Sequence, residues 1–352
     1  VNQTTVALTT YFTKHCGIHC FLGFFEPLPP GKEPLPLFEG RICLNRNLDR
    51  EAFSRFLTGN HIDVVQVNFL KKQNLVVMPQ LYEIAHQCGA KLIYAFHMCP
   101  GFQVVTYGSW ERMLYGWKHS DSAVPETKKW LMTKTQPVWK PLARRILQTK
   151  YRIPYESSDR VVVLSKNYFA PYLYYAGIKH SDKMIAIGNS LRFSQFATEE
   201  DIQSKEKTAI VVARFDEDTK RISLALKAEI EKEPQYQDWK LQLVGDGRDM
   251  PFYRYLVEKW NLQRVEFTGQ QNPMEYYMRA SIFVMTSSAE GWPMVLMEAA
   301  QMGTPIVAMD SFGSLHDMVK DGLNGRIVPN NNIQAFSSAL REVMSHEKMR
   351  KN

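Results

Sequence analysis

Two carboxylates separated by seven residues, Glu290 and Glu298, flank the expected start of a helix. The apolar run over 281–286 predicts a buried strand before them, and Pro293 suits a first helical position because it has no N–H to satisfy. The first amides of a helix lack intrahelical partners, and Gly291 leaves room for a ligand to approach the backbone, so this turn is a candidate anion pocket. Glu298 lies about one and a half turns into the helix, and its side chain is expected to point back toward the turn at the N-terminal end of the helix. The alternative is a capped core helix with two incidental acids.

Two cations earlier in the second half complement these acids. Arg214 ends the expected strand over 208–214, and Lys220 follows the acidic turn 216–218. At the carboxyl edge of one sheet, the planar arginine fork and the lysine point charge could bracket a diphosphate. Such cations, together with helix amides, stabilise the negative charge that develops when a nucleoside diphosphate leaves a sugar carbon. Surface pairs of arginine and lysine are common, so an ordinary solvated pair is the alternative.

The elements that would position these groups alternate between strands and helices. Strands are expected over 63–68, 91–97, 159–165, 183–188, 208–214, 240–244, 265–268, 281–286 and 305–309. Helices are expected over 49–57, 79–88, 168–176, 222–231, 250–260 and 274–279. This alternation predicts parallel α/β sheets, in which ligands bind beyond the carboxyl ends of the strands. His97 ends one of these strands and is therefore a candidate site residue, with a capped, satisfied histidine as the alternative.

The chain is long enough for two domains, since 352 residues of which 45% are hydrophobic can bury two cores. Residues 192–207 are polar and lack an apolar period. We therefore predict one domain over 1–191, a linker over 192–207 and a second domain over 208–352. The other expectations are a β-rich run over 4–13, a hairpin or edge excursion over 21–25 and 35–44, and a loop over 100–120.

Composition excludes several classes of protein. No apolar run approaches the length of a membrane span, and the N-terminus lacks the pattern of a signal peptide, so we expect a cytoplasmic protein. The cysteines are odd in number (16, 20, 43, 88 and 99), so we expect free thiols rather than a disulfide framework. The histidines and cysteines over 15–20 have no second cluster at metal-ligand spacing, and we expect no metal site.

The net charge of +7 is concentrated between Lys118 and Arg152, where nine basic residues stand against two acids. Proteins that coat nucleic acid are basic over broader faces and no nucleic-acid motif is present, so we expect no nucleic-acid partner. The cations over 128–152 are interleaved with tryptophan and leucine, which suits an anionic membrane surface at the inner face of the membrane. A solvated helical face is the alternative. Pro137 and Pro141 are expected to interrupt any single long helix here.

The order of several motifs resembles that of retaining glycosyltransferases of the GT-B type, in glycosyltransferase family 4 (glycosyl transferases group 1). Residues 290–299 are similar to the family's E-x7-E segment, 303–308 to the strand after it, and 321–329 to a further motif. The similarity covers 209–329 and, more weakly, 64–190. It implies an α/β fold with two Rossmann-like parallel-sheet domains facing a central cleft. The first domain would be on the acceptor side and the second would bind the nucleotide-sugar donor.

The resemblance also implies a role for each candidate residue. Arg214 and Lys220 match the pair that binds the diphosphate. Glu290 matches the carboxylate near the donor sugar, and Glu298 the one that holds the ribose hydroxyls. His97 is similar to a first-domain histidine that approaches the donor sugar. Main-chain amides between Gly291 and Val295, with Met294 among them, would contact sugar and phosphate.

The chain also departs from the family pattern. Ala213 and Arg221 stand where the family has glycines, which is expected to narrow or recharge the diphosphate turn. The family's first strand and glycine-rich loop are expected before Val1, and most of its crossover helix beyond Asn352. A chain without them is expected to turn over poorly.

We therefore predict a retaining, metal-independent hexosyltransferase of polysaccharide biosynthesis that uses no cofactor. It would move a sugar from a nucleoside-diphosphate sugar to a glycan or a lipid-linked saccharide. Two alternatives are open: a nucleotide-sugar epimerase or sugar phosphorylase on the same fold, and a noncatalytic nucleotide-sugar-binding protein.

Overall fold

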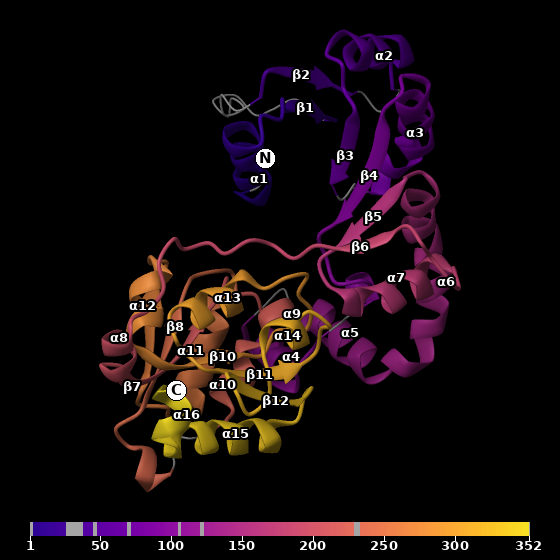
Figure 1. Ribbon diagram of the computed structural model, residues 1–352. Coiled ribbons are helices and arrows are strands. Elements are labelled where there is room, and N and C mark those ends of the chain that lie inside the picture. The colour runs from indigo at the N-terminus through magenta and orange to yellow at the C-terminus, as the bar shows by residue number, and fades with distance from the viewer. Residues whose placement is uncertain are drawn as a thin grey trace. The chain divides into compact units, whose positions relative to one another are not determined.

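The computed structural model describes residues 3–25, 38–44, 48–68, 72–104, 107–119, 123–228 and 233–351. The chain divides into two units, neither of which is a continuous stretch. Unit 1 comprises Val1–His97, Arg145–Val163 and Phe169–Asn189, and unit 2 comprises Met98–Arg144, Leu164–Tyr168 and Ser190–Asn352. Both units are built on parallel sheets, whose elements are labelled in Figure 1.

Unit 1 is organised around a four-stranded parallel sheet in the order β3-β4-β5-β6. Its strands are β3 (Val64–Asn68), β4 (Lys91–Phe96), β5 (Arg160–Val163) and β6 (Met184–Ala186). Its helices are α2 (Arg50–Gly59), α3 (Met78–Gln87), the latter part of α6 (Gln136–Glu156), α7 (Phe169–Ala176) and the short η1 (Lys72–Val77). α2 begins where the Asp49 carboxylate accepts the amide of Ala52 at 3.0 Å, as an N-cap does. The strands and helices predicted for this sheet are confirmed.

One expectation for the first 44 residues is wrong, and one of two alternatives in another is excluded. The run expected to be β-rich forms the helix α1 (Gln3–His15), because the β preference of threonine and valine is a preference for a pleated sheet surface and is overridden by context. The strands β1 (Phe21–Phe24) and β2 (Gly40–Cys43) pair in parallel, which excludes a hairpin, since a hairpin is antiparallel. Most of the connection between them lies outside the described residues.

Unit 2 is organised around a six-stranded parallel sheet in the order β12-β11-β10-β7-β8-β9. Its strands are β7 (Glu206–Val212), β8 (Lys240–Val244), β9 (Val265–Gly269), β10 (Ala280–Met285), β11 (Ile306–Asp310) and β12 (Gly325–Pro329). Its helices are α4 (Trp110–His119), α5 (Ala123–Lys134), the first part of α6, α8 (Glu199–Gln203), α9 (Glu217–Lys220), α10 (Ile222–Leu226), α11 (Met250–Lys259), α12 (Pro273–Arg279), α13 (Met294–Gln301), α14 (Leu315–Met318), α15 (Ile333–Ser345) and α16 (Glu347–Lys351). Short 3-10 helices are η2 (Phe102–Val104), η3 (Lys166–Tyr168) and η5 (Pro234–Tyr236). The strands predicted for the second half are confirmed.

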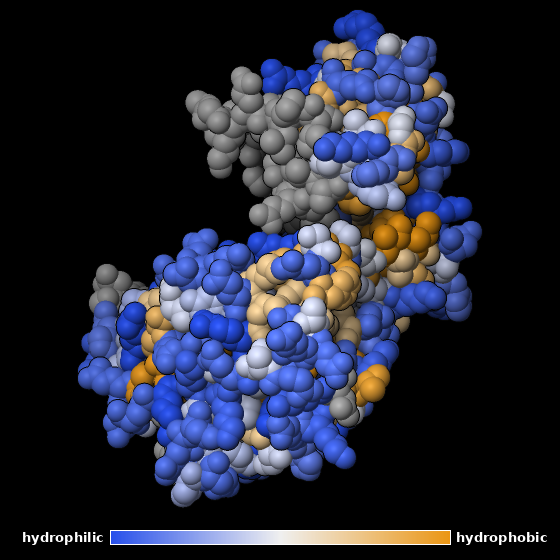
Figure 2. Space-filling view, turned by 60° about the vertical axis from the view of Figure 1, so that its left-hand side comes forward, coloured by the Kyte–Doolittle hydropathy of each residue, from blue (hydrophilic) through white to orange (hydrophobic). Residues whose placement is uncertain are grey.

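Apolar side chains cover both faces of the unit 2 sheet. All residues of β10 are buried, with Ile282 and Val284 in one cluster and Phe283 and Met285 in another. Successive strand residues point to opposite faces, so a strand covered on both sides has a continuous apolar sequence. Leu296 on α13 joins the second cluster, which makes that face of the helix core. The outer surface drawn in Figure 2 is mainly hydrophilic, with hydrophobic residues in separate patches.

Much of the segment between β4 and β5 is helical. α4 occupies part of the loop expected over 100–120, and α6 runs from residue 136 to 156 without a break. Pro137 lies in the first turn of α6, where a missing N–H has no partner to lose, and Pro141 is accommodated inside the helix. Pro141 therefore does not interrupt the helix as predicted, whereas Pro137 follows the break at Thr135 between α5 and α6.

The two units differ from the predicted domains because residues 98–144 pack with the C-terminal half of the chain. Arg112 on α4 forms an ion pair with Asp249 at 2.7 Å, and Lys129 on α5 pairs with Asp218 at 2.9 Å. These contacts join helices from the middle of the chain to loops of the six-stranded sheet.

The expected linker over 192–207 is partly ordered on unit 2. It contains α8, whose start is fixed by a reciprocal capping box between Thr198 and Asp201. The Ala197 amide donates to the carbonyl of Gln301 at 3.0 Å, which holds this segment against the end of α13.

Two composition-based expectations concern the described chain as a whole. The five cysteines are free thiols, as expected. None of the helices in the described ranges combines the length and the apolarity that crossing a bilayer requires.

Candidate functional site

The candidate site lies where the chain changes direction across the unit 2 sheet. β7 and β10 are neighbours, and the chain proceeds from β7 to one edge and from β10 to the other. In open parallel sheets, the loops beyond the carboxyl ends of such a strand pair diverge and leave a crevice where ligands bind. Residues 213–221 follow β7 and residues 286–293 follow β10, so both predicted turns lie at this switch point.

The structure brings Lys220 and Glu290 together. Lys220 Nζ donates to Glu290 Oε1 at 2.5 Å, and the side chains are only 22% and 16% exposed. The Glu290 carbonyl accepts the Tyr168 hydroxyl at 2.6 Å, and the Ser288 amide donates to the carbonyl of Thr219 at 2.7 Å. The two turns are therefore tied to each other at the backbone, and the predicted cation and carboxylate face one another.

A cavity of about 210 Å³ opens beside this pair, within unit 2. Its lining combines polar residues with apolar and aromatic ones; the lining residues are Asp218, Thr219, Ser288, Ala289, Glu290, Lys129, Met98, Cys99, Phe102 and Tyr107. Burial raises the pKa of the Cys99 thiol to about 11, so this group stays protonated at pH 7. A pocket lined by apolar side chains and a few polar groups suits a small polar ring that also has apolar faces.

Glu298 is buried in the body of unit 2 rather than open to the turn. Its side chain is 1% exposed. Oε2 accepts the Tyr277 hydroxyl at 3.1 Å, and Oε1 accepts Nη1 of Arg192 at 3.0 Å. Arg192 is a site candidate that the sequence did not reveal, because it stands in a polar segment expected to be a linker. The role of Glu298 toward a ribose stays a prediction.

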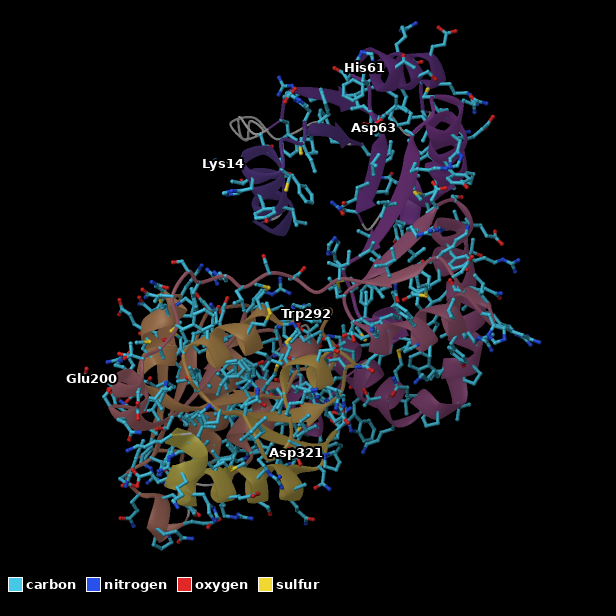
Figure 3. All side chains as sticks on the ribbon, viewed as in Figure 1. Lys14, His61, Asp63, Glu200, Trp292 and Asp321 are labelled. Atoms are coloured by element: carbon cyan, nitrogen blue, oxygen red, sulfur yellow. The ribbon has the colours of Figure 1, made fainter. Side chains whose placement is uncertain are left out.

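The helix turn itself differs from the expectation by one residue. Pro293 is the N-cap of α13, and Met294 and Val295 are its first two residues. Their amides have no acceptor one turn earlier in an α-helix, so they are available to an anion. Gly291 is buried in the turn before them. The Trp292 indole, labelled in Figure 3, donates to the sulfur of Met297 at 3.1 Å and lies along the helix.

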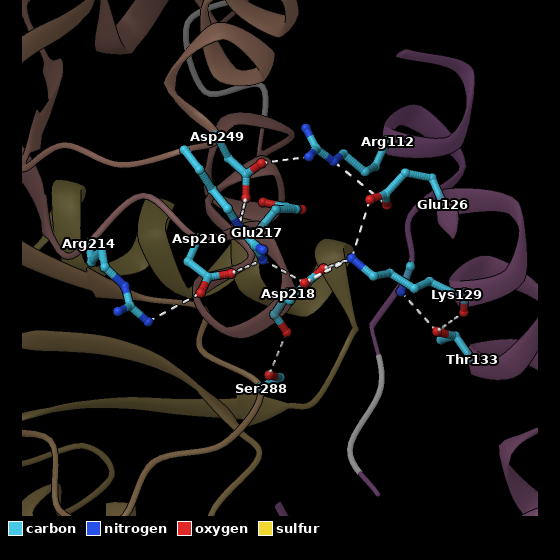
Figure 4. A network of polar contacts seen from close by, with 12 residues as sticks. Arg112, Glu126, Lys129, Thr133, Arg214, Asp216, Glu217, Asp218, Asp249 and Ser288 are labelled. Carbon is cyan, nitrogen blue, oxygen red and sulfur yellow. Dashed lines mark hydrogen bonds and ion pairs between the residues drawn. The ribbon is translucent and has the colours of Figure 1, made fainter. Parts of the chain in front are cut away.

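Arg214 does not join the Lys220–Glu290 pair. Its side chain is 74% exposed and Nη2 lies 3.3 Å from Asp216 Oδ2. Figure 4 shows Arg214 directed at Asp216 of the acidic turn. Arg248 contacts the same turn, at 2.8 Å from Asp216 and 2.6 Å from Asp218. The predicted diphosphate role of Arg214 therefore stays a prediction.

Asp218 and Glu217 in this turn have opposite electrostatic environments. Burial alone would raise the pKa of Asp218, but hydrogen bonds and charges from Lys129 and Arg248 hold it below its usual value. Glu217 is fully buried, and burial raises its pKa to about 7, despite hydrogen bonds from Ser223. At pH 7 the turn thus keeps the charged Asp218 carboxyl beside a Glu217 carboxyl that is about half protonated.

Arg221 stands at a position where the resembled family has glycine. Its backbone conformation shows why glycine suits this position, and its side-chain contacts show how arginine is tolerated. Its backbone has φ 50°, in the left-handed region that glycine enters without cost. The side chain is buried, and it donates to the carbonyls of Thr286 at 2.5 Å and Ser287 at 2.7 Å and to Asn331 at 2.7 Å. Burial lowers its pKa to about 10, which leaves it charged at pH 7. This charge is directed at the end of β10, and the expected effect of Arg221 on the diphosphate turn stays a prediction.

His97 belongs to unit 1, at the carboxyl end of β4. Its Nε2 lies 3.3 Å from Oδ1 of Asn68, the last residue of β3. Burial lowers the pKa of the imidazole, which favours the neutral ring at pH 7. Its predicted approach to a donor sugar stays a prediction.

Comparison with known proteins matches residues 193–352 to the family model described as Glycosyl transferases group 1. One curated relative, Exopolysaccharide phosphotransferase SCO2592 of Streptomyces coelicolor, is 31% identical over 144 residues, which are 40% of this chain and 15% of the relative. Another, Lipopolysaccharide 1,6-galactosyltransferase of Salmonella typhimurium, is 34% identical over 116 residues, which are 31% of this chain and 32% of the relative. The chain thus spans a third or less of the length of these two relatives.

A solved structure, Anabaena Alr3699/HepE in complex with UDP, matches with a TM-score of 0.70 at 13% identity. The match covers 99% of this chain and 88% of that chain, so it shows the fold over nearly the whole sequence. The predicted fold class, α/β of the GT-B type, is confirmed.

Proposed function

Residues 193–352 of this chain form a glycosyl transferases group 1 domain, and from that premise we propose that the protein is a retaining hexosyltransferase. It moves a sugar from a nucleoside-diphosphate sugar to a glycan or a lipid-linked saccharide in polysaccharide biosynthesis. The observation that carries the proposal is the Lys220–Glu290 pair beside the cavity at the switch point of the unit 2 sheet. A cation suited to a diphosphate and a carboxylate suited to a sugar stand together where such folds bind ligands.

In this proposal each part of the nucleotide-sugar donor has a binding partner in the protein. The diphosphate binds between Lys220, the amides at the start of α13 and Arg214, which turns to it from Asp216. The sugar enters the cavity and bonds to Glu290, and the ribose hydroxyls bond to Glu298. Binding of UDP by Anabaena Alr3699/HepE, which shares the fold, supports a nucleoside diphosphate as the donor class.

The chemistry follows from charge development on the leaving group. As the bond between the sugar and the diphosphate breaks, negative charge grows on the phosphate oxygen, and the Lys220 ammonium and the helix amides stabilise it. Lys220 and the helix amides supply the positive charge that a bound metal ion would otherwise provide, so the proposal needs neither a metal nor a cofactor. Glu290 acts as an electrostatic and orienting group near the sugar, since it is already hydrogen-bonded to Lys220.

We infer the acceptor from the name of one relative and from the positive charge of residues 128–152. A relative with the name Lipopolysaccharide 1,6-galactosyltransferase supports a glycan acceptor. A lipid-linked acceptor is presented at a membrane, and we propose that the basic segment 128–152 contacts that surface at its cytoplasmic face. His97, at the end of the unit 1 sheet, approaches the donor sugar in this proposal.

The test is donor-dependent transfer, or slow donor hydrolysis, with a panel of nucleotide sugars. Lys220→Ala is expected to lower kcat by about 10²- to 10³-fold, the effect of removing one donor to a developing anion. Lys207→Ala is the matched control, because it breaks an exposed ion pair with Asp238 in the same unit and should leave transfer unchanged. If Glu290→Ala and Lys220→Ala both retained transfer and hydrolysis, the site assignment would be wrong.

The same assays separate the alternatives. Epimerised donor without an acceptor would indicate an epimerase, and the absorbance of bound pyridoxal phosphate would indicate a phosphorylase. Calorimetry that detects donor binding without transfer or hydrolysis would indicate a noncatalytic binding protein.

A further inference from the structure

A second ion pair between a lysine and a carboxylate lines the cavity of unit 2, in addition to the Lys220–Glu290 pair beside it. Lys129 Nζ on α5 donates to both carboxylate oxygens of Asp218, at 3.0 Å to Oδ1 and 2.9 Å to Oδ2 (Figure 4). The two side chains are 34% and 31% exposed, and both residues belong to the cavity lining. The cavity therefore has a second carboxylate beside Glu290.

Asp218 is held in one orientation and keeps the capacity to accept a further hydrogen bond. Its Oδ2 accepts Lys129 and also Nη2 of Arg248 at 2.6 Å, whereas in the described parts of the chain Oδ1 accepts Lys129 alone. A carboxylate oxygen can accept two hydrogen bonds, so Oδ1 can accept one more. Burial opposes the ionisation of Asp218, but hydrogen bonds and charge from Lys129 and Arg248 lower its pKa, so the group is charged at pH 7. A charged carboxylate in a cavity is a strong acceptor for a ligand hydroxyl.

The next residue along the chain supplies a second polar group at the same place. Thr219 lines the cavity, and its Oγ1 is buried with no hydrogen-bond partner among the described residues. The backbone here is fixed, because the Thr219 carbonyl accepts the Ser288 amide at 2.7 Å and the Ser288 hydroxyl at 3.2 Å. Buried hydroxyls in proteins are generally hydrogen-bonded, and a hydroxyl of a sugar in the cavity would give Thr219 its partner.

Charge indicates which kind of sugar suits this cavity. The charged residues of its described lining are Asp218, Glu290 and Lys129. Lys129 is already paired with Asp218, and it also lies 3.2 Å from Glu126. Among the described lining residues no cation is therefore left for an acidic group on a sugar ring, and two carboxylates would repel such a group. A neutral sugar, whose hydroxyls donate hydrogen bonds, matches the lining.

We propose that Asp218 and Thr219 bind hydroxyls of the transferred sugar, and that Asp218 excludes sugars that carry a carboxylate, such as uronic acids. This inference rests on the proposed function, which places the sugar in the cavity. It assigns the donor to the class of neutral nucleotide sugars. Lys129 acts through Asp218 and is a positioning residue.

Comparison of a neutral donor with its acidic counterpart tests the exclusion. The full chain is assayed with nucleotide hexoses and with the matching uronates, in which the primary alcohol of the sugar is replaced by a carboxylate. We expect the wild type to prefer the neutral donor by at least about 100-fold in kcat/KM. Asp218→Asn removes the charge with little change of shape, and the preference should fall about tenfold or more. Asp216→Asn is the matched control, because Asp216 contacts the same Arg248 at 2.8 Å but is not one of the described residues that line the cavity, and it should change the preference less than about threefold.

A pair of threonine variants tests the hydroxyl contact. Thr219→Val removes Oγ1, and it should raise the KM for the neutral donor about three- to tenfold while the affinity for the nucleoside diphosphate alone stays unchanged. Thr208→Val is the control, because Thr208 Oγ1 on β7 is also buried without a partner in the described chain but lies outside the described cavity lining. This control should change neither value.

Replacement of Lys129 tests its positioning role. Lys129→Met should raise the KM for the neutral donor about tenfold with a smaller change in kcat, because Asp218 loses the contact that orients it. Lys129→Arg keeps a cation on α5 and should restore most of the affinity. A KM as high in Lys129→Arg as in Lys129→Met would contradict the positioning role.

Three results would overturn the inference: a wild-type kcat/KM for the uronate that equals or exceeds that for the neutral hexose, an unchanged preference in Asp218→Asn, or equal effects of Thr219→Val and Thr208→Val. Each of these leaves the proposed transferase intact, because sugar transfer is still observed. If no donor were transferred, hydrolysed or bound, the proposed function would be refuted and this inference with it. The two failures are therefore distinguishable.

Discussion

Arg192 and Glu298 form an ion pair that joins a half-exposed guanidinium to a carboxylate with 1% exposure, at 3.0 Å. The other oxygen of Glu298 is occupied by the Tyr277 hydroxyl, so the acid expected to hold a ribose is already bonded on both sides. Each carboxylate oxygen can accept a second hydrogen bond, which leaves room for a ligand hydroxyl without loss of Arg192. Arg192 therefore positions the acid and balances its charge.

The first prediction follows from this pair. Arg192→Gln should lower the free energy of unfolding by about 1–3 kcal/mol, because it leaves a buried carboxylate without its cation, and should raise the KM for the donor more than it lowers kcat. Urea unfolding and steady-state kinetics measure the two effects. Arg152→Gln, which breaks an exposed pair with Glu156 in unit 1, should change stability by less than about 0.5 kcal/mol. Equal losses of unfolding free energy in the two variants would contradict the role of Arg192 in balancing the charge of Glu298.

The second prediction separates the backbone of Arg221 from its side chain. Arg221→Ala and Arg221→Gly both remove the bonds to the carbonyls of Thr286 and Ser287, so both should weaken donor binding at the turn after β10. Glycine accepts φ 50° without strain, and the glycine variant should therefore be about 1 kcal/mol more stable than the alanine variant. Thermal or urea unfolding of the pair checks this order. An alanine variant as stable as the glycine variant would show that the left-handed conformation carries no cost here.

The third prediction concerns pH. Burial raises the pKa of Glu217 from 4.5 to about 7, so the folded protein holds this proton more tightly than the unfolded chain. The contribution of Glu217 to stability is complete below about pH 4.5, declines as the pH rises toward 7 and is constant above it. Its slope is at most about 1.4 kcal/mol per pH unit.

Glu217→Gln removes this titration. The variant should lose stability less steeply than the wild type between pH 5 and 7 and should be the more stable of the two at pH 8. Urea unfolding at intervals of half a pH unit measures the difference. Parallel curves for the two proteins over this range would refute the assignment.

The fourth prediction tests the assignment of α4 to unit 2. Arg112→Ala removes the nearer of the two arginines that face the buried Asp249, leaving Arg248 at 3.6 Å, and it removes a guanidinium that lies 5.0 Å over the Phe252 ring. We expect a loss of about 3–5 kcal/mol in unfolding free energy and faster proteolysis between residues 98 and 144. Arg55→Ala, at an exposed helix pair with Glu51, should cost less than about 0.5 kcal/mol. Unchanged protease resistance in the Arg112 variant would count against this packing.

The parts of the fold that were predictable are those with a strong one-dimensional pattern. β10 is apolar at every position because both faces of the sheet are covered, so its strand was clear from the sequence. The meeting of Lys220 and Glu290 was predictable because both follow parallel strands, and the carboxyl ends of parallel strands share one edge.

The parts that were missed depend on partners far away in the chain. In α4 only Met113 and Gly116 are buried, so few of its side chains mark a core face, and its position is set by contacts with α5 and with Asp249. Arg192 reaches a carboxylate 106 residues later, and no spacing rule connects two such residues. The direction of the Arg221 side chain is likewise set by carbonyls 65 and 66 residues away.

The interrupted path of the chain through unit 2 has a consequence for folding while the protein is being synthesised. Lys129 on α5 leaves the ribosome before its partner Asp218, which follows 89 residues later. At a synthesis rate of about 5–20 residues per second, Asp218 is added to the chain roughly 4 to 18 s after Lys129. Unit 2 therefore cannot be completed in the order in which its residues are made, and its early helices lack the partners of their packed faces during that interval.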